Sequence, residues 1–428
     1  MKAVLEMIAR HKEGEAVGMT SICSAHPLVI AAACRHAVRR GLPFVLIEAT
    51  SNQVNQDGGY TGMTPSRFRD FVADIAAQEG LTPERVLLGG DHLGPNAWQT
   101  LSAEEAMARS DVLIDQYVAA GFRKIHLDCS MACADEAGSL SDAVVATRAA
   151  RLCAVAETAH SRVGGEPPVY VIGTEVPVPG GAAEDLETLA VTTPQRAQAT
   201  LDIHRERFAA AGLADAWARV VGVVVQPGVE FDHRKVVDYD PTAAVALSGM
   251  IRADPRVVFE AHSTDYQTPR SLRRLVRDHF AILKVGPGVT FALREALWAL
   301  DAIERDWLGD AAASQFRAKT LAAMKAAPEH WTKYYHGAGA ALDFDLQYSL
   351  SDRIRYYWPD PQIAAAQSLM MQNLIDRPPP PALISQHLPR AYAAVRRGDI
   401  PPTPVDMVME HVIGVVDDYA AACSPSEM

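Results

Sequence analysis

Short apolar runs alternate with amphipathic stretches along the first three quarters of the chain, and each run ends in polar residues or glycine. The runs have the length of strands, and the stretches between them carry the helical spacing of apolar positions. Eight runs recur, at residues 16–23, 43–50, 85–92, 124–130, 169–176, 219–227, 256–263 and 280–287. The pattern predicts eight successive strand–loop–helix units.

Eight consecutive units with near-continuous apolar strands are typical of an α/β fold, the (β/α)8 TIM barrel, whose parallel strands are buried on both sides. The alternative is a doubly wound open sheet, which usually carries a glycine-rich turn after its first strand. Here the first strand runs into SICSAHP instead. We therefore expect a barrel over residues 1–308.

The remaining residues, 309–428, are expected to form a helical C-terminal extension that packs on the barrel or on a partner. Residues 289–308 have the pattern of the closing barrel helix, and residues 311–327 and 366–377 are amphipathic. The run RPPPPALI at 377–384 breaks helix and marks a stiff connector.

Composition narrows the class of partner. The chain has 428 residues, 40 Lys and Arg against 52 Asp and Glu, and a net charge of −12. Without a Lys/Arg block, such a chain repels nucleic acid and anionic lipid, so small molecules or other proteins are the expected partners. No signal peptide or membrane-length apolar run is visible, and six cysteines without a CxxC pair predict reduced thiols in a cytoplasmic protein.

In a barrel of this kind the active site lies at the C-terminal ends of the strands. Ionisable and polar side chains follow at least six of the predicted strands, which is an unusually rich set. As catalytic groups we predict Asp91, Asp128, Glu260 and Lys284. As substrate-binding groups we predict Glu48, Asn52, Gln226, Ser263, Asp265 and Gly286.

A divalent cation is the simplest way to compensate so many buried charges. Side chains alternate along a strand, so His126 shares a face with Asp128, as Glu260 does with His262. We predict that zinc or manganese is held by His92, Glu175 and His262, with Asp128 as a fourth ligand or as a partner of a ligand. The alternative is a network of hydrogen bonds without metal.

Lys284 lies on the last predicted strand and has two alternative roles. A desolvated lysine can form a Schiff base with a ketose carbonyl, or it can clamp substrate oxygen or phosphate as an ammonium ion. Carboxylates nearby favour the ammonium form. The following VGPGVT places Gly286 and Gly288 before a helix, where such barrels often bind phosphate, although Gly-Pro-Gly also makes an ordinary turn.

The long polar loop at residues 48–65 is rich in amides and glycine. Amides and carboxylates match sugar hydroxyl groups, so we expect a lid over a polyhydroxylated ligand, or else a solvated loop. Neither a GxSxG elbow nor a GxxxxGK[ST] loop occurs in the sequence, which disfavours a serine hydrolase and a P-loop kinase.

Six long motifs give the chain a strong resemblance to the GatZ/KbaZ family, the Z subunits of D-tagatose-1,6-bisphosphate aldolase. They are GGDHLGPN (89–96), KIHLDCSMAC (124–133), VIGTEVPVPGG (171–181), VVQPGVEFD (224–232), FEAHSTDYQT (259–268) and ILKVGPGVTFALREALWAL (282–300). The resemblance implies a barrel protein of ketose and hexitol metabolism. Its members are described as accessory subunits of a class II aldolase or as tagatose-6-phosphate kinases, and some are similar to metal-dependent ketose 4-epimerases.

Among these roles, the kinase label fits the sequence poorly because no kinase loop is present. The polar strand ends fit a metal-dependent ketose 4-epimerase or an aldolase-type lyase, in which a carboxylate removes a proton and a metal polarises an oxygen. The alternative is a non-catalytic subunit that stabilises and activates a separate aldolase, in a homo- or hetero-oligomer.

Overall fold

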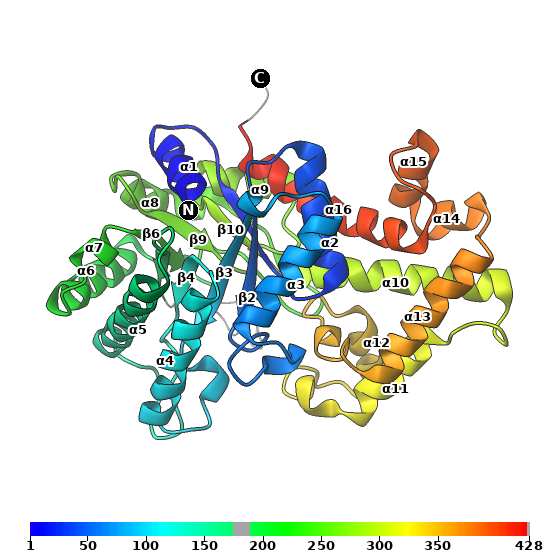
Figure 1. Cartoon of the computed structure of the whole chain (residues 1–428), viewed down its shortest axis with the longest axis horizontal. Helices are drawn as coiled ribbons and strands as arrows, with labels where there is room; N and C mark the ends of the chain where they lie inside the picture. The colour runs from blue at the N-terminus through cyan, green and yellow to red at the C-terminus, as the bar shows by residue number, and fades with distance from the viewer. Residues whose placement is uncertain (174–188, 426–428) are drawn as a thin grey trace.

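The computed structural model describes residues 1–173 and 189–425, and its centre is a closed barrel of parallel strands (Figure 1). Within this described part the barrel has eight strands in the order β1-β10-β9-β6-β5-β4-β3-β2. They are β1 (Met19–Cys23), β2 (Val45–Thr50), β3 (Val86–Leu93), β4 (Lys124–Leu127), β5 (Val169–Ile172), β6 (Val220–Val225), β9 (Val258–Ala261) and β10 (Ile282–Val285). The prediction of a (β/α)8 barrel is confirmed.

Helices follow the strands and cover the outside of the barrel. The first turn of α2 shows how the sequence sets its ends: His26 Nδ1 accepts the Leu28 N–H, Pro27 follows, and Gly41 closes the helix at a φ of +63°. The helices of this part are α1 (Lys2–Lys12), α2 (Pro27–Arg40), α3 (Pro65–Gln78), α4 (Ala103–Ala119), α5 (Asp142–Val163), α6 (Pro194–Ala210), α7 (Ala214–Trp217), α8 (Pro241–Arg252), α9 (Pro269–Arg277) and α10 (Pro287–Leu308).

The strands are buried on both faces, which explains their continuous apolar sequence. All six residues of β6 are buried between the barrel interior and the helices. A small antiparallel hairpin, β7 (Glu230–Phe231) with β8 (Val236–Val237), follows β6 and was not predicted. Two-residue strands leave no periodic signal in a sequence.

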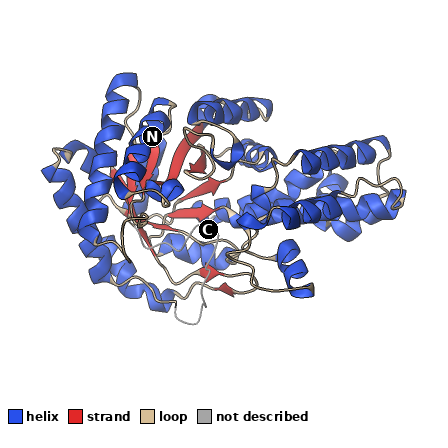
Figure 2. Ribbon diagram, turned by 90° about the horizontal axis from the view of Figure 1, so that it is seen from below, coloured by secondary structure: helices blue, strands red, loops and turns tan. Residues whose placement is uncertain are grey.

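The C-terminal region is helical, and its helices extend to one side of the barrel (Figures 1 and 2). It comprises α11 (Phe316–Ala326), α12 (Ala340–Tyr348), α13 (Pro361–Asp376), α14 (Pro381–His387), α15 (Pro389–Arg397) and α16 (Pro404–Cys423). The last helix returns to the barrel and packs against α2, α9 and α10.

Ion pairs reinforce the return of α16. Arg35 on α2 pairs with Asp406, and His36 Nε2 lies 2.9 Å from Asp417 Oδ1. The hairpin provides a second junction, since the Leu350 N–H donates to the His233 carbonyl at 3.0 Å. The C-terminal region is therefore anchored to the barrel at several places, which include α16 and the β7–β8 hairpin.

In the described part of the chain no helix combines the length and the apolar character that crossing a membrane requires. All six cysteines are free thiols, as the sequence predicts.

Candidate functional site

A layer of alternating charges crosses the barrel interior. Lys124 Nζ lies 2.7 Å from Glu48 Oε1 and 2.7 Å from Glu260 Oε2. Lys284 Nζ pairs with Glu48 on the other side and lies 3.8 Å from Glu260 Oε1. The side chains of Glu48, Lys124 and Glu260 are completely buried, so each charge depends on its partners for stability.

Glycine makes room for this layer. Gly89 is the register partner of Glu48 on the neighbouring strand, and a Cβ at Gly89 would lie 2.4 Å from Glu48 Oε1. Only glycine lets the carboxylate fold into the barrel there. The Ser21 hydroxyl donates to the same carboxylate from β1.

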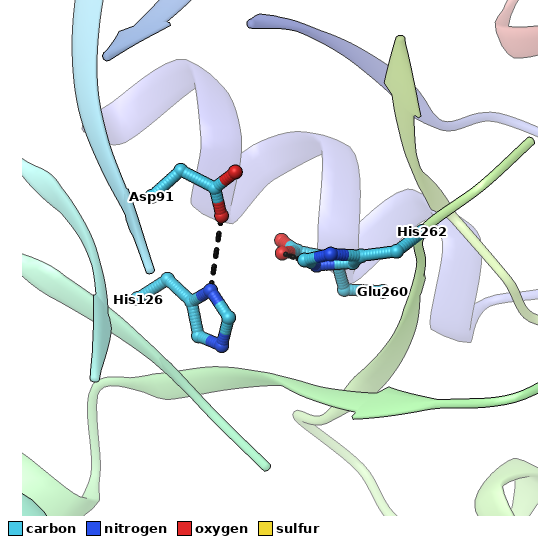
Figure 3. A group of neighbouring side chains, drawn as sticks. All are labelled: Asp91, His126, Glu260 and His262. Carbon is cyan, nitrogen blue, oxygen red and sulfur yellow. Dashed lines mark hydrogen bonds and ion pairs between the residues drawn. The ribbon is translucent and has the colours of Figure 1, made fainter. Parts of the chain in front are cut away.

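Above this layer three histidines converge at the C-terminal ends of β3, β4 and β9. The ring centroids of His92, His126 and His262 lie 5.0–5.4 Å apart in each pair. Asp91 and Glu260 lie among these rings, and Asp91 Oδ1 is 3.0 Å from His126 Nδ1 (Figure 3).

Four of these side chains meet the geometric needs of a metal site. Asp91, His126, Glu260 and His262 each offer a ligand atom, and these atoms lie within 4.8 Å of one another. His126 Nε2 is buried and has no hydrogen-bond partner among the described residues. A buried imidazole nitrogen without a partner is costly unless a ligand uses it.

His92 is held in place by a carboxylate. Its Nδ1 lies 2.6 Å from Asp128 Oδ2, while its Nε2 lies 3.7 Å from Asp91 Oδ2. Ser130 donates to the other oxygen of Asp128 at 2.6 Å and fixes that carboxylate in turn. A carboxylate on one imidazole nitrogen is the common way to orient a histidine whose other nitrogen binds metal.

The backbone at the mouth is strained where these groups sit. His92 has a φ of +47° and Ser263 a φ of +52°. Non-glycine residues rarely adopt this left-handed region, and such strain is concentrated at functional sites. Gly94 allows the chain to pass the Asp128 carbonyl, since a Cβ there would lie 1.8 Å from that oxygen.

The carboxylates are held ionised despite their burial. Burial alone would raise the pKa of Asp91, but His92, Lys284 and the contact with His126 outweigh it and hold the pKa well below its usual value. The pKa of Glu260 is likewise lowered, because Lys124 and Lys284 overcome the cost of burial.

The pKa values of Lys284 and His262 shift in opposite directions. Burial would lower the pKa of Lys284, but Asp91 and its other anionic neighbours raise it well above its usual value, so the amine is an ammonium ion. Burial lowers the pKa of His262 to about 4, so this imidazole is neutral and keeps a lone pair.

A second group of metal-ligand atoms, from Cys23, Glu48 and Asp91, lies beside the first. Burial raises the pKa of the Cys23 thiol well above its usual value. A protonated thiol is a poor ligand, so this group has the weaker donor set.

The predicted site residues fall into two groups. The four catalytic candidates, together with Glu48, His92 and His262, lie in the cluster. Glu175 lies outside the described residues.

The other predicted substrate ligands are engaged elsewhere. Asp265 Oδ1 accepts the N–H groups of Gly286 at 3.0 Å and Gly288 at 2.7 Å. Gln226 Oε1 accepts the Gly228 and Val229 N–H groups of its own loop. Ser263 has a φ of +52° and lies two residues beyond the end of β9.

The loop at residues 48–65 folds largely on itself. Asn55 Oδ1 accepts two backbone N–H groups of the loop, Gln53 Oε1 accepts a third, and Asn52 is half-buried with its carbonyl accepting the Tyr60 N–H. The side-chain amides of Gln53 and Asn55 thus serve the loop backbone, and substrate binding by Asn52 stays a prediction.

Sequence reasoning missed Lys124 and gave His126 no role as a ligand. The signal was present, because the alternation in KIHLD places Lys124, His126 and Asp128 on one face. A lysine at the start of a strand looks like an ordinary surface residue, and only barrel closure reveals the two carboxylates that it faces.

Two comparisons with known proteins both point to proteins of tagatose metabolism. The model of a family described as D-tagatose-1,6-bisphosphate aldolase subunit GatZ/KbaZ-like matches residues 4–424. The crystal structure of a probable tagatose 6 phosphate kinase from Sinorhizobium meliloti 1021 is 51% identical, covers 95% of this chain and 100% of its own, and superposes with a TM-score of 0.87.

A more remote similarity is to the fructose-bisphosphate aldolase of Campylobacter jejuni. That structure is 14% identical over 86% of this chain and 91% of its own, with a TM-score of 0.46. Values this low carry no argument about function.

Proposed function

The chain belongs to the GatZ/KbaZ-like family of D-tagatose-1,6-bisphosphate aldolase subunits, and we propose that it is itself a metal-dependent ketose 4-epimerase with aldolase-type chemistry. One observation carries this proposal: three histidines and ionised carboxylates converge at the strand ends above two buried ammonium groups. A protein that only binds another subunit does not need a buried cluster of charged and imidazole side chains.

The donor set fits a divalent cation. Four buried carboxylates, from Glu48, Asp91, Asp128 and Glu260, face only two ammonium groups. The carboxylates outnumber the ammonium groups by two; His92, whose charge lowers the pKa of Asp91, offsets part of this excess, and a divalent cation would offset the rest.

His126, Glu260 and His262 would hold the cation, with His92 as a further imidazole, and this leaves the Asp91 carboxylate for proton transfer. Imidazole with carboxylate suits zinc or manganese. When bound, the cation would polarise the oxygens of a ketose.

Asp91 is the residue that we assign to proton transfer. Its carboxylate is ionised and can accept the proton of the C4 hydroxyl group. As that proton leaves, the C3–C4 bond breaks, C4 becomes an aldehyde, and the electron pair of the bond passes to an enediolate over C2 and C3. Re-formation of the bond on the other face of the aldehyde, with return of the proton, gives the C4 epimer.

Lys284 assists this transfer as an ammonium clamp. Its Nζ lies 2.7 Å from Asp91 Oδ1, and its positive charge is one of those that lower the pKa of Asp91. An enediolate oxygen that draws Lys284 toward itself weakens this pairing. Asp91 therefore becomes more basic as negative charge grows on the substrate.

Asp128 acts through His92 and is a positioning residue. Its bond to His92 Nδ1 fixes the ring so that Nε2 faces the cluster. An Asp128→Asn variant keeps the shape of the side chain and loses the charge, so it should lower metal affinity by roughly tenfold or more.

The alternative role is that of an accessory subunit of a separate aldolase. The family consists of aldolase subunits, and this favours a protein partner as well as a sugar ligand. The C–C bond cleavage proposed here is also the chemistry of an aldolase, so the two roles share one site. They differ in whether the chain acts alone.

Turnover by the isolated, metal-loaded chain separates the two roles. Fructose, tagatose and their phosphates are each incubated with the wild type, with His262→Ala, and with the control His411→Ala, whose half-buried ring contacts Glu295 and not the cluster. The proposal expects conversion by the wild type and the control but not by His262→Ala. If only mixtures with an added aldolase subunit react, and His262→Ala enhances them as well as the wild type does, the accessory role is correct.

A further inference from the structure

The loop that begins with His262 is strained. This loop, residues 262–267, follows β9 and is called the β9 loop below. Two of its residues other than glycine lie in the left-handed region, Ser263 with a φ of +52° and Tyr266 with a φ of +64°. Such residues persist only where the surrounding contacts hold them in place. The contacts of the β9 loop therefore decide where the His262 ring points.

Four successive residues of the β9 loop are each bound by a different part of the protein. The barrel holds two of them: Asp265 accepts two N–H groups at the start of α10, and the Gln267 amide donates to a carbonyl of β8 at 2.8 Å. The C-terminal region contacts the other two. The Tyr266 hydroxyl group donates to the Leu350 carbonyl at 2.6 Å, and Thr264 contacts the last helix, α16.

Thr264 connects that helix to the strand of the ammonium clamp. Its hydroxyl group is fully buried and donates to the Lys284 carbonyl at 2.5 Å. The same oxygen lies 3.1 Å from the hydroxyl oxygen of Tyr419 on α16. A threonine hydroxyl has a single proton, and Lys284 receives it, so Tyr419 is the donor to Thr264. A chain of hydrogen bonds thus runs from Tyr419 through Thr264 to Lys284.

Tyr419 is suited to be the fixed end of this chain. Its side chain is buried, and burial raises the pKa of its hydroxyl group well above the usual value, so the group remains a donor. Hydrogen bonds in series strengthen one another where water is excluded.

The helix that carries Tyr419 is anchored on both sides of it. Asp417 pairs with His36 on α2, and the Cys423 carbonyl accepts the Gly18 N–H at 2.9 Å. Between these anchors α16 packs against α2, α9 and β1. The Tyr419 hydroxyl group is therefore presented from a rigid support.

We propose that Tyr419 is a positioning residue of the site, which acts through Thr264 to fix the backbone of Lys284 and the loop that carries His262. This proposal rests on the proposed function. It adds a residue of the C-terminal region, residues 309–428, to the groups on which the reaction depends.

The effect should fall on the chemical step. Lys284 clamps an enediolate oxygen, whose negative charge is greater in the transition state than in the bound ketose. A small displacement of the clamp therefore weakens transition-state binding more than ground-state binding. Loss of the Tyr419 hydroxyl group should lower kcat by roughly fivefold, as expected for one neutral hydrogen bond, and should leave KM nearly unchanged.

Three variants of the full-length protein isolate the chain of hydrogen bonds. Tyr419→Phe removes one hydroxyl group, Thr264→Val replaces a hydroxyl group by a methyl group, and Thr264→Ser keeps the hydroxyl group. Tyr357→Phe is the matched control, because Tyr357 is also buried and donates to the Ala327 carbonyl within the C-terminal region. Melting temperatures verify that each protein is folded.

Hydrogen–deuterium exchange followed by mass spectrometry tests the contact without requiring metal or turnover. Peptides that cover residues 262–267 and 282–285 should exchange severalfold faster in Tyr419→Phe and Thr264→Val than in the wild type. Thr264→Ser and Tyr357→Phe should match the wild type in exchange and in kcat. The double variant Tyr419→Phe/Thr264→Val should turn over no more slowly than Thr264→Val, because the chain is already broken there.

Three results would overturn the inference and leave the proposed function standing: a Tyr419→Phe protein with the kcat of the wild type, a rise in KM at constant kcat, or an equal loss of kcat in the Tyr357→Phe control. Unchanged exchange of both peptides in Tyr419→Phe would overturn it as well. Conversely, faster exchange in Tyr419→Phe and Thr264→Val, in a protein that converts no ketose, would support the chain of hydrogen bonds and contradict the proposed function.

Discussion

Replacing Lys124 by methionine should destabilise the barrel strongly and in a pH-dependent way. Lys124 Nζ contacts one oxygen of Glu48 and one of Glu260, each at 2.7 Å, and all three side chains are fully buried. Each contact is worth about 6 kcal/mol of gross attraction at an effective dielectric constant of about 20. Dehydration of the ions offsets most of this attraction.

The loss of stability exceeds the net stabilisation that the ion pairs provide, because the variant leaves the buried carboxylates of Glu48 and Glu260 without one of their ammonium partners. Lys284, which also pairs with Asp91, would be the remaining ammonium group for Glu48 and Glu260. Removing one partner from a buried pair costs about 3–5 kcal/mol. The free energy of unfolding of Lys124→Met should fall by that amount at pH 7.

The direction of the pH dependence follows from Glu260. In the wild type its pKa is depressed, so its contribution to stability is present above the unfolded pKa of about 4.3 and is lost only at lower pH. Without Lys124, the balance shifts toward the burial that raises its pKa. The destabilisation should therefore be largest at neutral pH and should shrink as the pH falls toward about 4.3.

Equilibrium unfolding in urea at pH 7 and pH 5, followed by circular dichroism, measures this effect. Lys2→Met is the matched control, because Lys2 is exposed and its loss should change stability by less than about 0.5 kcal/mol. A Lys124→Met protein as stable as the control, or a loss of stability of equal size at both pH values, would refute the claim that Lys124 stabilises the buried carboxylates of Glu48 and Glu260.

Three further predictions concern the metal, a buried carboxylate and the lysine of β10. Elemental analysis should find about one zinc or manganese ion per wild-type chain and clearly less in His126→Ala; equal content in both would remove His126 from the site. Asp265 has a folded pKa of about 6, raised by burial, so its stabilising contribution is present below about pH 4 and is lost as the pH rises through 6. Asp265→Asn should abolish that loss of roughly 3 kcal/mol in unfolding experiments across this range, and an unchanged pH profile would contradict the assignment. Borohydride added with a ketose should leave no adduct on Lys284 by mass spectrometry, since a raised pKa keeps its amine charged, and a mass shift there would establish a Schiff-base route instead.

The barrel could be predicted from the sequence because each strand is buried on both faces. Residues 219–227 contain β6 (Val220–Val225), six of the other strands likewise lie inside their predicted runs, and β3 (Val86–Leu93) extends one residue beyond its run. The closing helix, predicted at 289–308, is α10 (Pro287–Leu308). Continuous burial produces a continuous apolar run, which a sequence shows directly.

The pairing of polar groups could not be predicted in the same way. The sequence indicates that Lys124, Glu48 and Glu260 occupy strands, but barrel closure decides that they meet. Asp265 illustrates the limit, since its distance from Gly288 along the chain gives no hint that it accepts that N–H.

The most direct test of the central claim is a proton NMR assay of the isolated, metal-loaded chain with a ketose in deuterated water. The account predicts that the C4 epimer appears with its C4 hydrogen retained, because the C3–C4 bond breaks while the C4–H bond does not. Conversion with deuterium at C4 would contradict the bond-cleavage route. Absence of conversion for fructose, tagatose and their phosphates would contradict the claim that this chain is an enzyme.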